Sequence, residues 1–386
     1  MRVVLLVGAT PIIAVVSLLS LGAHAPRLPR VGVAGSLVLP TYSGPGLVAG
    51  VVGSLAAGAS VLLGARRLGG ALTAMGALAS TATAIIFTDQ LRAARAAGAP
   101  VRASTFAVRR SPKPLPDRTE TYADDADGRP LRVDVYLPPS PGAGPAPLMI
   151  YVHGGGWIQG TPDDASADLR WFADHGYVVL APEYSLATDH RPTWDVAMPQ
   201  IGMALVWAAA NAAQWGADSD RIVMWGGSAG ANLALATSYA AAAGRLVLPN
   251  GAIPPTVRAV AGEVPAVDPL TVYDNDDPEW GTATRSMVQT YIGGSPADHP
   301  ERIAAVRVNS YASPAAPPTL LTACVPDHLV PVAGIRDFVT EAERAGVDIR
   351  AEYRRWGDHL ISARYDGLPN QTMLHLYLRH FRAHGA

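Results

Sequence analysis

Cysteine, lysine and acidic side chains are scarce or unevenly placed in this sequence. The 386-residue chain has one cysteine, Cys324, which excludes an intrachain disulfide and a cysteine-rich zinc site. Its one lysine, Lys113, stands in Ser-Pro-Lys-Pro, so the chain has no Walker A phosphate loop. The zinc-protease pattern HExxH is absent as well. These absences favour a function that uses no metal and no cofactor.

Acidic residues are missing from the first 88 positions, and Asp89 is the first of them. The remaining chain, 89–386, holds 25 basic and 32 acidic residues, which leaves a net charge of about −7. A mildly acidic body without a basic stripe argues against nucleic acid as a partner.

Three long uncharged stretches, 3–26, 47–65 and 68–88, begin the chain. Each approaches the roughly 20 residues that a helix needs to cross a hydrocarbon layer about 30 Å thick. Buried helices of a soluble protein are the alternative, but three in succession without an acidic residue favour membrane insertion. A fourth apolar piece, Val31–Leu39, is too short to span. We therefore predict a multi-pass membrane protein with the lipid bilayer as a partner.

The first stretch also ends like a secretory signal, because Ala23-His24-Ala25 is an A-x-A pattern. Pro26 should hinder cleavage, so we expect a retained helix. With three spans, five arginines share the side of the C-terminal region and three lie opposite, which favours the cytoplasmic side for that region. The five are Arg27, Arg30, Arg92, Arg95 and Arg102, and the three are Arg2, Arg66 and Arg67.

The pattern changes after a polar, then proline-rich linker at 89–118. From Thr119 short apolar runs alternate with longer helical segments, which is typical of an α/β fold. Expected strands are Leu131–Leu137, Leu148–Val152, Tyr177–Ala181, Ile222–Trp225, Val257–Ala261 and Thr319–Ala323. Expected helices are Trp194–Trp215, Ala229–Ala243, Val332–Ala345 and Gln371–His384. We divide the chain into a membrane region, 1–105, and an α/β domain, 106–386. The proline-rich linker around Pro112–Pro116 is a boundary across which few packing contacts are expected, so a chain that begins near Phe106 should be soluble and active without the spans.

Ser228 stands in Gly226-Gly227-Ser228-Ala229-Gly230, after an expected strand and at the start of an expected helix. This is the context of a nucleophile elbow, where a tight turn lifts a serine hydroxyl clear of the sheet. The glycines leave room where strand and helix nearly touch. A glycine-rich turn with an incidental serine is the alternative.

A second glycine-rich motif, His153-Gly154-Gly155-Gly156-Trp157, follows the expected strand Leu148–Val152. Acyl transfer builds negative charge on a carbonyl oxygen, and fixed backbone N–H groups aimed at that oxygen stabilise it. A phosphate-binding loop is the rival interpretation, but the spacing does not give GxGxxG. We expect His153 to hold the loop by hydrogen bonding rather than to act as a base.

HGGGW, with GxSAG about 75 residues further on, resembles the hormone-sensitive-lipase-like and related carboxylesterase branch of the α/β-hydrolases. The resemblance covers roughly Thr119 to the C-terminus. It implies a mostly parallel sheet flanked by helices and hydrolysis of carboxylic esters. It also implies a nucleophile at Ser228 and backbone oxyanion donors at Gly154, Gly155 and Ala229.

Two positions depart from the lipase-like pattern. Gly227 stands where an acidic residue is common, and Ala231 stands where a glycine is usual. Kynurenine formamidases and plant prenylcysteine methylesterases, which are related branches, are looser at these places. The reaction type is unaffected, and the substrate stays open.

The acid and the base of such a hydrolase are expected at two later strand ends. Asp327 follows the expected strand Thr319–Ala323, and His359 follows a strand region at 349–356. The order serine, aspartate, histidine is that of the α/β-hydrolases. The resemblance implies that His359 takes the proton from Ser228 and that Asp327 fixes the imidazole.

Other residues compete for these roles. Asp358 and His328 adjoin the two candidates, Asp268 begins an insertion, and His375 and His380 lie on the last expected helix.

A cap-like insertion, about 265–310, separates two expected strands and should cover the site as a lid. Its acid-rich segment 274–280 lacks EF-hand spacing and is interrupted by Pro278, so a solvated loop is favoured over a metal site.

The sequence therefore predicts a membrane-anchored serine hydrolase that cleaves a small-molecule or lipidic carboxylic ester through an acyl-enzyme. Amide or formamide hydrolysis, or demethylation of a prenylated methyl ester, are the alternatives among enzymes. A catalytically inactive, membrane-tethered binding protein with a hydrolase fold is the alternative of another class. No oligomeric state is favoured.

Overall fold

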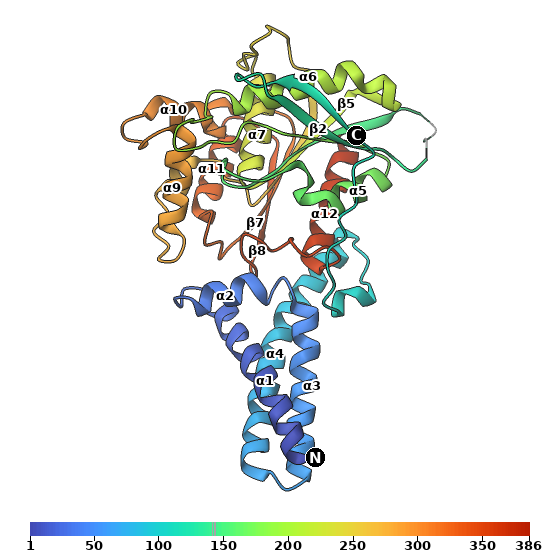
Figure 1. Ribbon diagram of the computed structural model, residues 1–386, viewed down its shortest axis with the longest axis vertical. Coiled ribbons are helices and arrows are strands. Elements are labelled where there is room, and N and C mark those ends of the chain that lie inside the picture. The colour runs from blue at the N-terminus through green and yellow to red at the C-terminus, as the bar shows by residue number, and fades with distance from the viewer. Residues whose placement is uncertain (141, 143) are drawn as a thin grey trace. The chain divides into compact units, whose positions relative to one another are not determined.

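The computed structural model describes residues 1–140, 142 and 144–386, and their contacts form two compact units. The first unit consists of Met1–Ser111, Cys324–His328 and Arg354–Leu376. The second unit consists of Pro112–Ala323, Leu329–Tyr353 and Tyr377–Ala386. Figure 1 shows the elements of both.

One sheet forms the centre of the fold, and the described residues contribute eight strands to it in the order β1-β2-β4-β3-β5-β6-β7-β8. The pairs β1–β2 and β2–β4 are antiparallel, whereas β4, β3, β5, β6 and β7 run parallel to their neighbours. The strands are β1 (Arg118–Asp124), β2 (Pro130–Tyr136), β3 (Ala146–Val152), β4 (Val178–Pro182), β5 (Ala217–Gly227), β6 (Val257–Glu263), β7 (Thr319–Cys324) and β8 (Ile349–Arg354). The predicted fold class is confirmed, because the sheet is mostly parallel. Its strands are continuous apolar runs because helices cover both faces of the sheet.

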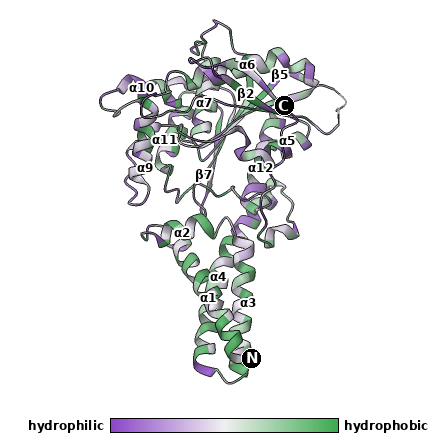
Figure 2. Cartoon of the chain, in the orientation of Figure 1, coloured by the Kyte–Doolittle hydropathy of each residue, from purple (hydrophilic) through white to green (hydrophobic). Residues whose placement is uncertain are grey.

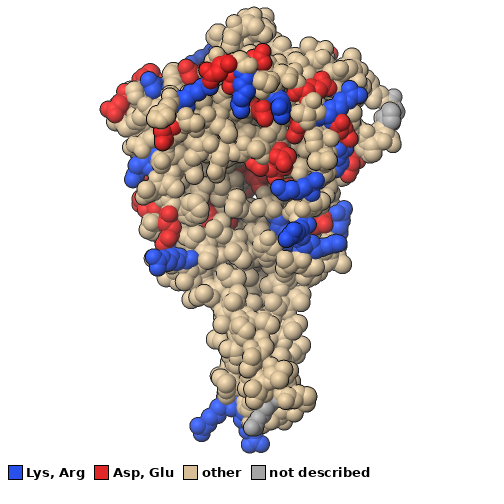
Figure 3. Space-filling view, viewed as in Figure 1, with Lys and Arg blue, Asp and Glu red and all other residues tan. Residues whose placement is uncertain are grey.

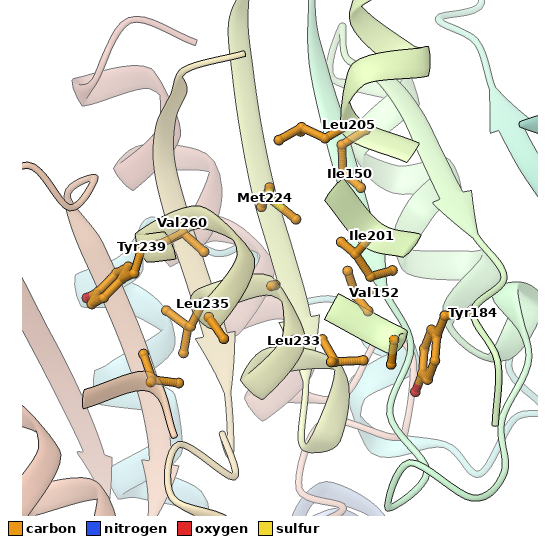
Figure 4. Close-up of a cluster of buried hydrophobic side chains, with 14 of the residues drawn as sticks. Ile150, Val152, Tyr184, Ile201, Leu205, Met224, Leu233, Leu235, Tyr239 and Val260 are labelled. Atoms are coloured by element: carbon orange, nitrogen blue, oxygen red, sulfur yellow. The ribbon is translucent and has the colours of Figure 1, made fainter. Parts of the chain in front are cut away.

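Helices cover both faces of this sheet. On one face, α6 (Ala197–Asn211) and α7 (Ala229–Ala242) contact each other and the central strands. Figure 4 shows Met224 of β5 and Val260 of β6 among the buried side chains of these helices. On the other face, Trp225 packs against Phe172 of α5 (Ser166–Asp174) and against Tyr377 of α12 (Leu368–Ala383), with ring centroids 5.5 and 6.0 Å apart.

The insertion between β6 and β7 is helical. It holds α8 (Pro269–Tyr273), α9 (Gly281–Ile292), α10 (Pro300–Val306) and the short 3-10 helix η4 (Val308–Tyr311). Helix α10 contacts both α8 and α7, so the insertion packs on the helix that follows Ser228. Two further 3-10 helices, η2 (Pro162–Ala165) and η3 (Ala212–Trp215), and the helix α11 (Val332–Arg344) complete the second unit.

Four helices begin the first unit: α1 (Arg2–His24), α2 (Val31–Val38), α3 (Ser43–Leu62) and α4 (Arg66–Ala97). A 3-10 helix, η1 (Ala103–Phe106), follows them. Figure 2 shows apolar residues along α1, α3 and α4. These three, among the described residues, are long and apolar enough to cross a membrane by length and composition. The apolar piece Val31–Leu39 forms α2, whose 8 residues are too few to span.

The segment that follows the N-terminal helices contacts residues near the end of the chain. The buried guanidinium of Arg364 donates hydrogen bonds to the carbonyls of Ser104, Thr105 and Ala107 at 2.7–3.3 Å. The carbonyls around η1 need donors, and the planar guanidinium supplies several in a fixed fork. Arg364 thus ties the segment around η1 to the residues after β8 within the first unit.

Candidate active site

Ser228 occupies a strained turn between β5 and α7. Its backbone angles are φ 55° and ψ −121°, a region that a non-glycine residue rarely adopts. Three backbone hydrogen bonds hold it there. Its N–H donates to Glu263 O at 2.8 Å, and its carbonyl accepts from Asn232 N at 3.1 Å and from Ala266 N at 3.3 Å. Strain of this kind persists only where the surroundings impose it, and it gathers at functional sites.

The two glycines that flank the serine lie where backbones touch. A Cβ on Gly230 would stand 2.1 Å from Val152 O and 2.3 Å from His153 O. A Cβ on Gly226 would stand 2.4 Å from Gly230 O. Any larger residue at either position would push α7 away from β3 or β5. The glycine spacing around Ser228 thus follows from how closely helix and strands pack.

The loop His153–Trp157 runs directly past the serine. A Cβ on Gly154 would lie 3.4 Å from Ser228 Cβ and 2.9 Å from Gly227 O. Gly155 has φ 116°, and its carbonyl accepts from the N–H groups of Ile158 and Gln159 at 3.2 and 3.1 Å. The loop is thereby closed into a turn beside Ser228.

Three backbone N–H groups are available around the serine. Within the described part of the chain, the amides of Gly154, Gly155 and Ala229 donate to no acceptor. Ala229 is the first residue of α7, where helical N–H groups have no partner inside the helix and carry partial positive charge. An oxygen with negative charge is the natural acceptor for such a group of donors.

His153 supports this loop. Its Nδ1 lies 2.8 Å from Gly154 O, and its ring stacks on Tyr184 at a centroid distance of 4.4 Å. Tyr184 in turn donates its hydroxyl to His153 O at 3.0 Å. Burial lowers the pKa of His153, so the ring is neutral at pH 7. These contacts are those of a structural residue.

Trp157 links the loop to α7 and to the insertion. It is buried, has φ 63°, and stacks on Tyr291 of α9 with ring centroids 4.7 Å apart. Its Nε1 donates to Asn232 Oδ1 at 3.3 Å, and Asn232 Nδ2 donates to Val306 O at 2.9 Å. The loop geometry therefore depends on α9 and α10 as well as on β3.

Asp327 and His359, the predicted acid and base, are hydrogen-bonded to each other. Both belong to the first unit, Asp327 in the loop after β7 and His359 in the loop after β8. His359 Nδ1 lies 2.9 Å from Asp327 Oδ2, and both residues are buried. Because a carboxylate only accepts, His359 Nδ1 donates this hydrogen bond and carries a proton.

The competing residues have other partners. Asp358 bonds the ring of His328, not that of His359. Asp268 caps α8 by accepting from Leu270 N at 3.0 Å and pairs with Arg307 at 2.8 Å. His380 Nε2 lies 3.2 Å from Pro318 O, and burial lowers its pKa to about 4. His375 lies on α12 with it.

The acid-rich segment of the insertion forms a turn at the start of α9. Asp277 Oδ1 accepts from the N–H groups of Glu279 and Trp280, both at 2.9 Å, and Asn275 Oδ1 accepts from Asp277 N at 3.1 Å. These bonds use the side-chain oxygens to satisfy backbone donors before the helix.

Two supports of the site had no signal in the sequence. Glu263 holds the Ser228 N–H through its backbone carbonyl, which any residue type could supply. Ser36 of α2 bonds Asp358, beside His359, from 322 positions away. Backbone acceptors and distant single hydroxyls leave no motif.

Comparison with known proteins gives a family and a fold. The BD-FAE family model matches residues 133–341, just over half of the chain. Three relatives are esterase LipC and esterase LipQ of Mycobacterium tuberculosis, each 29% identical, and bovine hormone-sensitive lipase, 28% identical. The matches cover 50%, 57% and 45% of this chain and 48%, 51% and 22% of the respective relatives. The chain thus spans about half of the two esterases and less of the lipase.

Solved structures of Thermogutta terrifontis esterase 2 share the architecture. The form phosphonylated by sarin has a TM-score of 0.60 at 23% identity, over 72% of this chain and 98% of that one. The propionate-bound form has a TM-score of 0.57 at 23% identity, over 69% and 94%. This likeness, with the strand order above, shows the α/β-hydrolase fold.

Proposed function

We propose that this chain, which belongs to the BD-FAE family, is a membrane-anchored serine hydrolase that cleaves carboxylic esters through an acyl-enzyme. The observation that carries the proposal is the strained Ser228 turn, with the amides of Gly154, Gly155 and Ala229 beside it and without acceptors in the described chain. The esterases and the lipase among the relatives support the choice of ester as the bond that is cleaved.

In the first half-reaction, Ser228 Oγ attacks the ester carbonyl carbon while His359 Nε2 takes the hydroxyl proton. This step requires the two atoms to come within hydrogen-bond reach in the working enzyme. The carbonyl oxygen becomes an oxyanion, which the amides of Gly154, Gly155 and Ala229 stabilise. The C–O bond then breaks, the alcohol leaves with the proton from His359, and an acyl group stays on Ser228.

In the second half-reaction, water replaces the alcohol. His359 takes a proton from the water, the hydroxide attacks the acyl carbon, and the same amides hold the second oxyanion. Collapse releases the carboxylic acid and returns the proton to Ser228. Asp327 stabilises the imidazolium that forms in each half and keeps the ring in the tautomer with Nε2 basic.

We propose that residues 1–105 form the membrane region, with α1, α3 and α4 as spans, and that residues 106–386 form the catalytic domain. Large apolar side chains on these helices face outward: Val3, Leu55 and Leu78 are 62%, 68% and 73% exposed. Figure 3 shows the visible face of the helices free of charged groups, apart from basic groups at one end. Contact of such an apolar surface with lipid carries no hydrophobic cost, whereas its exposure to water is unfavourable. The arginine distribution favours the cytoplasmic side for the catalytic domain.

The test is covalent labelling of the full chain in detergent with a fluorophosphonate, which bonds an activated serine oxygen and releases fluoride. We expect one label, found on the peptide that holds Ser228, and parallel turnover of a short aryl ester. Ser228→Ala should abolish the label, and His359→Ala should slow both reactions by several powers of ten without changing the melting temperature much.

Three results discriminate between the candidate functions. A wild-type chain that neither labels nor hydrolyses would make it a binding protein with a hydrolase fold. Labelling with turnover of formamides but not of esters would move the substrate to the amide class. Release of the protein from membranes by an alkaline carbonate wash would overturn the anchor.

A further inference from the structure

Asp358 is a buried carboxylate that the proposed reaction does not use. It is 1% exposed and directly precedes His359. Burial alone would raise its pKa, but hydrogen bonds from His328 and from Ser36 outweigh burial and keep the pKa of Asp358 below its usual value. Burying a charged carboxylate costs desolvation free energy, which its hydrogen bonds have to offset. The partners of Asp358 therefore indicate which parts of the chain it positions.

One oxygen of Asp358 holds the backbone of both catalytic loops. Oδ1 accepts from His359 N at 2.8 Å and from His328 N at 3.0 Å. His328 directly follows Asp327 in the chain. The same oxygen therefore fixes the peptide of His359 and the peptide next to Asp327, the two residues whose side chains are bonded at 2.9 Å.

The other oxygen of Asp358 faces the N-terminal region. Oδ2 accepts from Ser36 Oγ at 2.6 Å and from the ring of His328. His328 Nε2 lies 3.0 Å from Pro26 O. Each ring nitrogen of His328 thus faces an acceptor, which only the doubly protonated ring satisfies. Pro26 O and Ser36 Oγ therefore supply the hydrogen-bond partners for the side of His328 and Asp358 that faces the N-terminal region.

The position of Ser36 is fixed by close packing between α1 and α2. A Cβ on Gly35 would lie 2.3 Å from Ala23 N, and a Cβ on Gly22 would lie 1.9 Å from Val31 O. The end of α1 also meets the loop that carries His359, because His24 packs on Trp356 with ring centroids 4.6 Å apart. Little freedom remains for the hydroxyl of Ser36 to leave Asp358.

We propose that Ser36 of the N-terminal region and Asp358 are positioning residues, which align the Asp327–His359 pair for proton transfer. This inference rests on the proposed function and deepens it. Ser36 touches no reacting atom; it orients the carboxylate that sets the peptide of His359. The membrane region is then part of the catalytic apparatus and not only an anchor.

The experiment uses four variants of the full chain in detergent: Ser36→Ala, Ser36→Thr, Asp358→Asn, and Ser36→Ala combined with Asp358→Asn. Ser20→Ala is the matched control. Ser20 is also buried, in α1, and its Oγ bonds Thr83 Oγ1 at 3.0 Å and Ala79 O at 3.3 Å, away from the catalytic loops. Turnover of a short aryl ester, the rate of fluorophosphonate labelling and the melting temperature are measured for each.

We expect Ser36→Ala to lower kcat about tenfold with KM nearly unchanged, because alignment of the base affects the transition state more than binding. Ser36→Thr keeps the hydroxyl and should recover most of the loss. Ser20→Ala should lower the melting temperature about as much as Ser36→Ala does, but should leave kcat unchanged. Asp358→Asn should cost about 100-fold, and the double variant should match it, because Ser36 acts through Asp358.

The inference is overturned if Ser36→Ala and Ser20→Ala have the same kcat, or if the double variant loses the product of the two single effects. Should Asp358→Asn fail to fold, the comparison of Ser36→Ala with Ser36→Thr and Ser20→Ala decides alone. A wild-type chain that neither labels nor turns over ester would instead overturn the proposed function and this inference with it.

Discussion

Gly154→Ala adds one methyl group where the glycine loop passes the proposed nucleophile. The added Cβ would lie 2.9 Å from Gly227 O, and Gly154 has no left-handed φ that alanine would resist. Carbon and oxygen approach no closer than about 3.3 Å even in favourable C–H···O contacts, so the loop has to move by roughly 0.4 Å. The backbone strain of the loop stays as it was. The change therefore isolates the position of the amides.

The expected cost follows from what such donors contribute. Removal of one oxyanion donor lowers kcat by about 10²–10³, or roughly 2.7–4 kcal/mol. A donor that is shifted by a fraction of an ångström keeps part of its hydrogen bond, so we expect kcat to fall about 10- to 100-fold, roughly 1.4–2.7 kcal/mol. KM should stay within about threefold, because ground-state binding needs the amides less.

Steady-state turnover of a short aryl ester by the full chain measures both constants, and the rate of fluorophosphonate labelling should fall in parallel. Gly227→Ala is the matched control: it is next to the serine, but its Cβ would meet only Glu263 Oε2, at 3.9 Å. We expect the kcat of Gly227→Ala to stay within about twofold of the wild type. Equal kcat in the two variants, or a raised KM with unchanged kcat in Gly154→Ala, would refute an oxyanion role for this loop.

Four further predictions follow from the same structure. Asp327→Asn should lower kcat by about 10⁴ with little change in melting temperature, because the imidazole loses the partner that selects its tautomer. Arg364→Ala removes the donor shared by the buried carbonyl of Thr105 and the partly buried carbonyls of Ser104 and Ala107, and should destabilise the chain by about 3 kcal/mol in thermal unfolding, which lysine, lacking the planar fork, does not restore. The pKa of His380 falls from 6.5 to about 4 on folding because of burial, so the unfolded chain binds the extra proton in this window. Stability should drop by about 2–3 kcal/mol as the pH falls from 7 to 4, and His380→Gln should flatten that dependence. A chain that begins at Phe106 lacks Ser36 and should be insoluble, or should turn over a short ester at least tenfold more slowly than the full chain.

The strands and the serine turn were predictable because their signals are local. The apolar run Leu148–Val152, which forms most of β3, is buried throughout. A continuous apolar run of this kind has to be buried on both faces, and a sheet with helices on both sides is the structure that buries it. The glycines around Ser228 are likewise predictable from their spacing, since Gly226 and Gly230 lie where the backbones of strand and helix meet.

The supports of the site were not predictable, because they join residues that are far apart in the chain. Ser36 and Asp358 are 322 positions apart, and Arg364 reaches carbonyls more than 250 positions earlier. Backbone carbonyls leave no trace in residue type, and a serine in an apolar stretch is indistinguishable from one that only packs between helices. The proline-rich linker marks a change of composition. Composition does not predict whether segments after the linker contact residues before it, as Arg364 does.

Contacts between residues far apart in the chain also distinguish the two candidate bases, His328 and His359. Each of two neighbouring loops supplies one aspartate and one histidine, adjacent in sequence, and the rings pair crosswise: His359 with Asp327 and His328 with Asp358. Residue types alone leave either pair as a candidate, although only Asp327 and His359 follow the order serine, aspartate, histidine. The ring of His328 is enclosed, because its Nδ1 faces Asp358 and its Nε2 faces Pro26 O at 3.0 Å. A ring with both nitrogens committed to acceptors cannot take a proton from a serine. The carbonyl that faces the second nitrogen belongs to Pro26, between α1 and α2, so the contacts of the N-terminal region favour His359 over His328 as the proposed base.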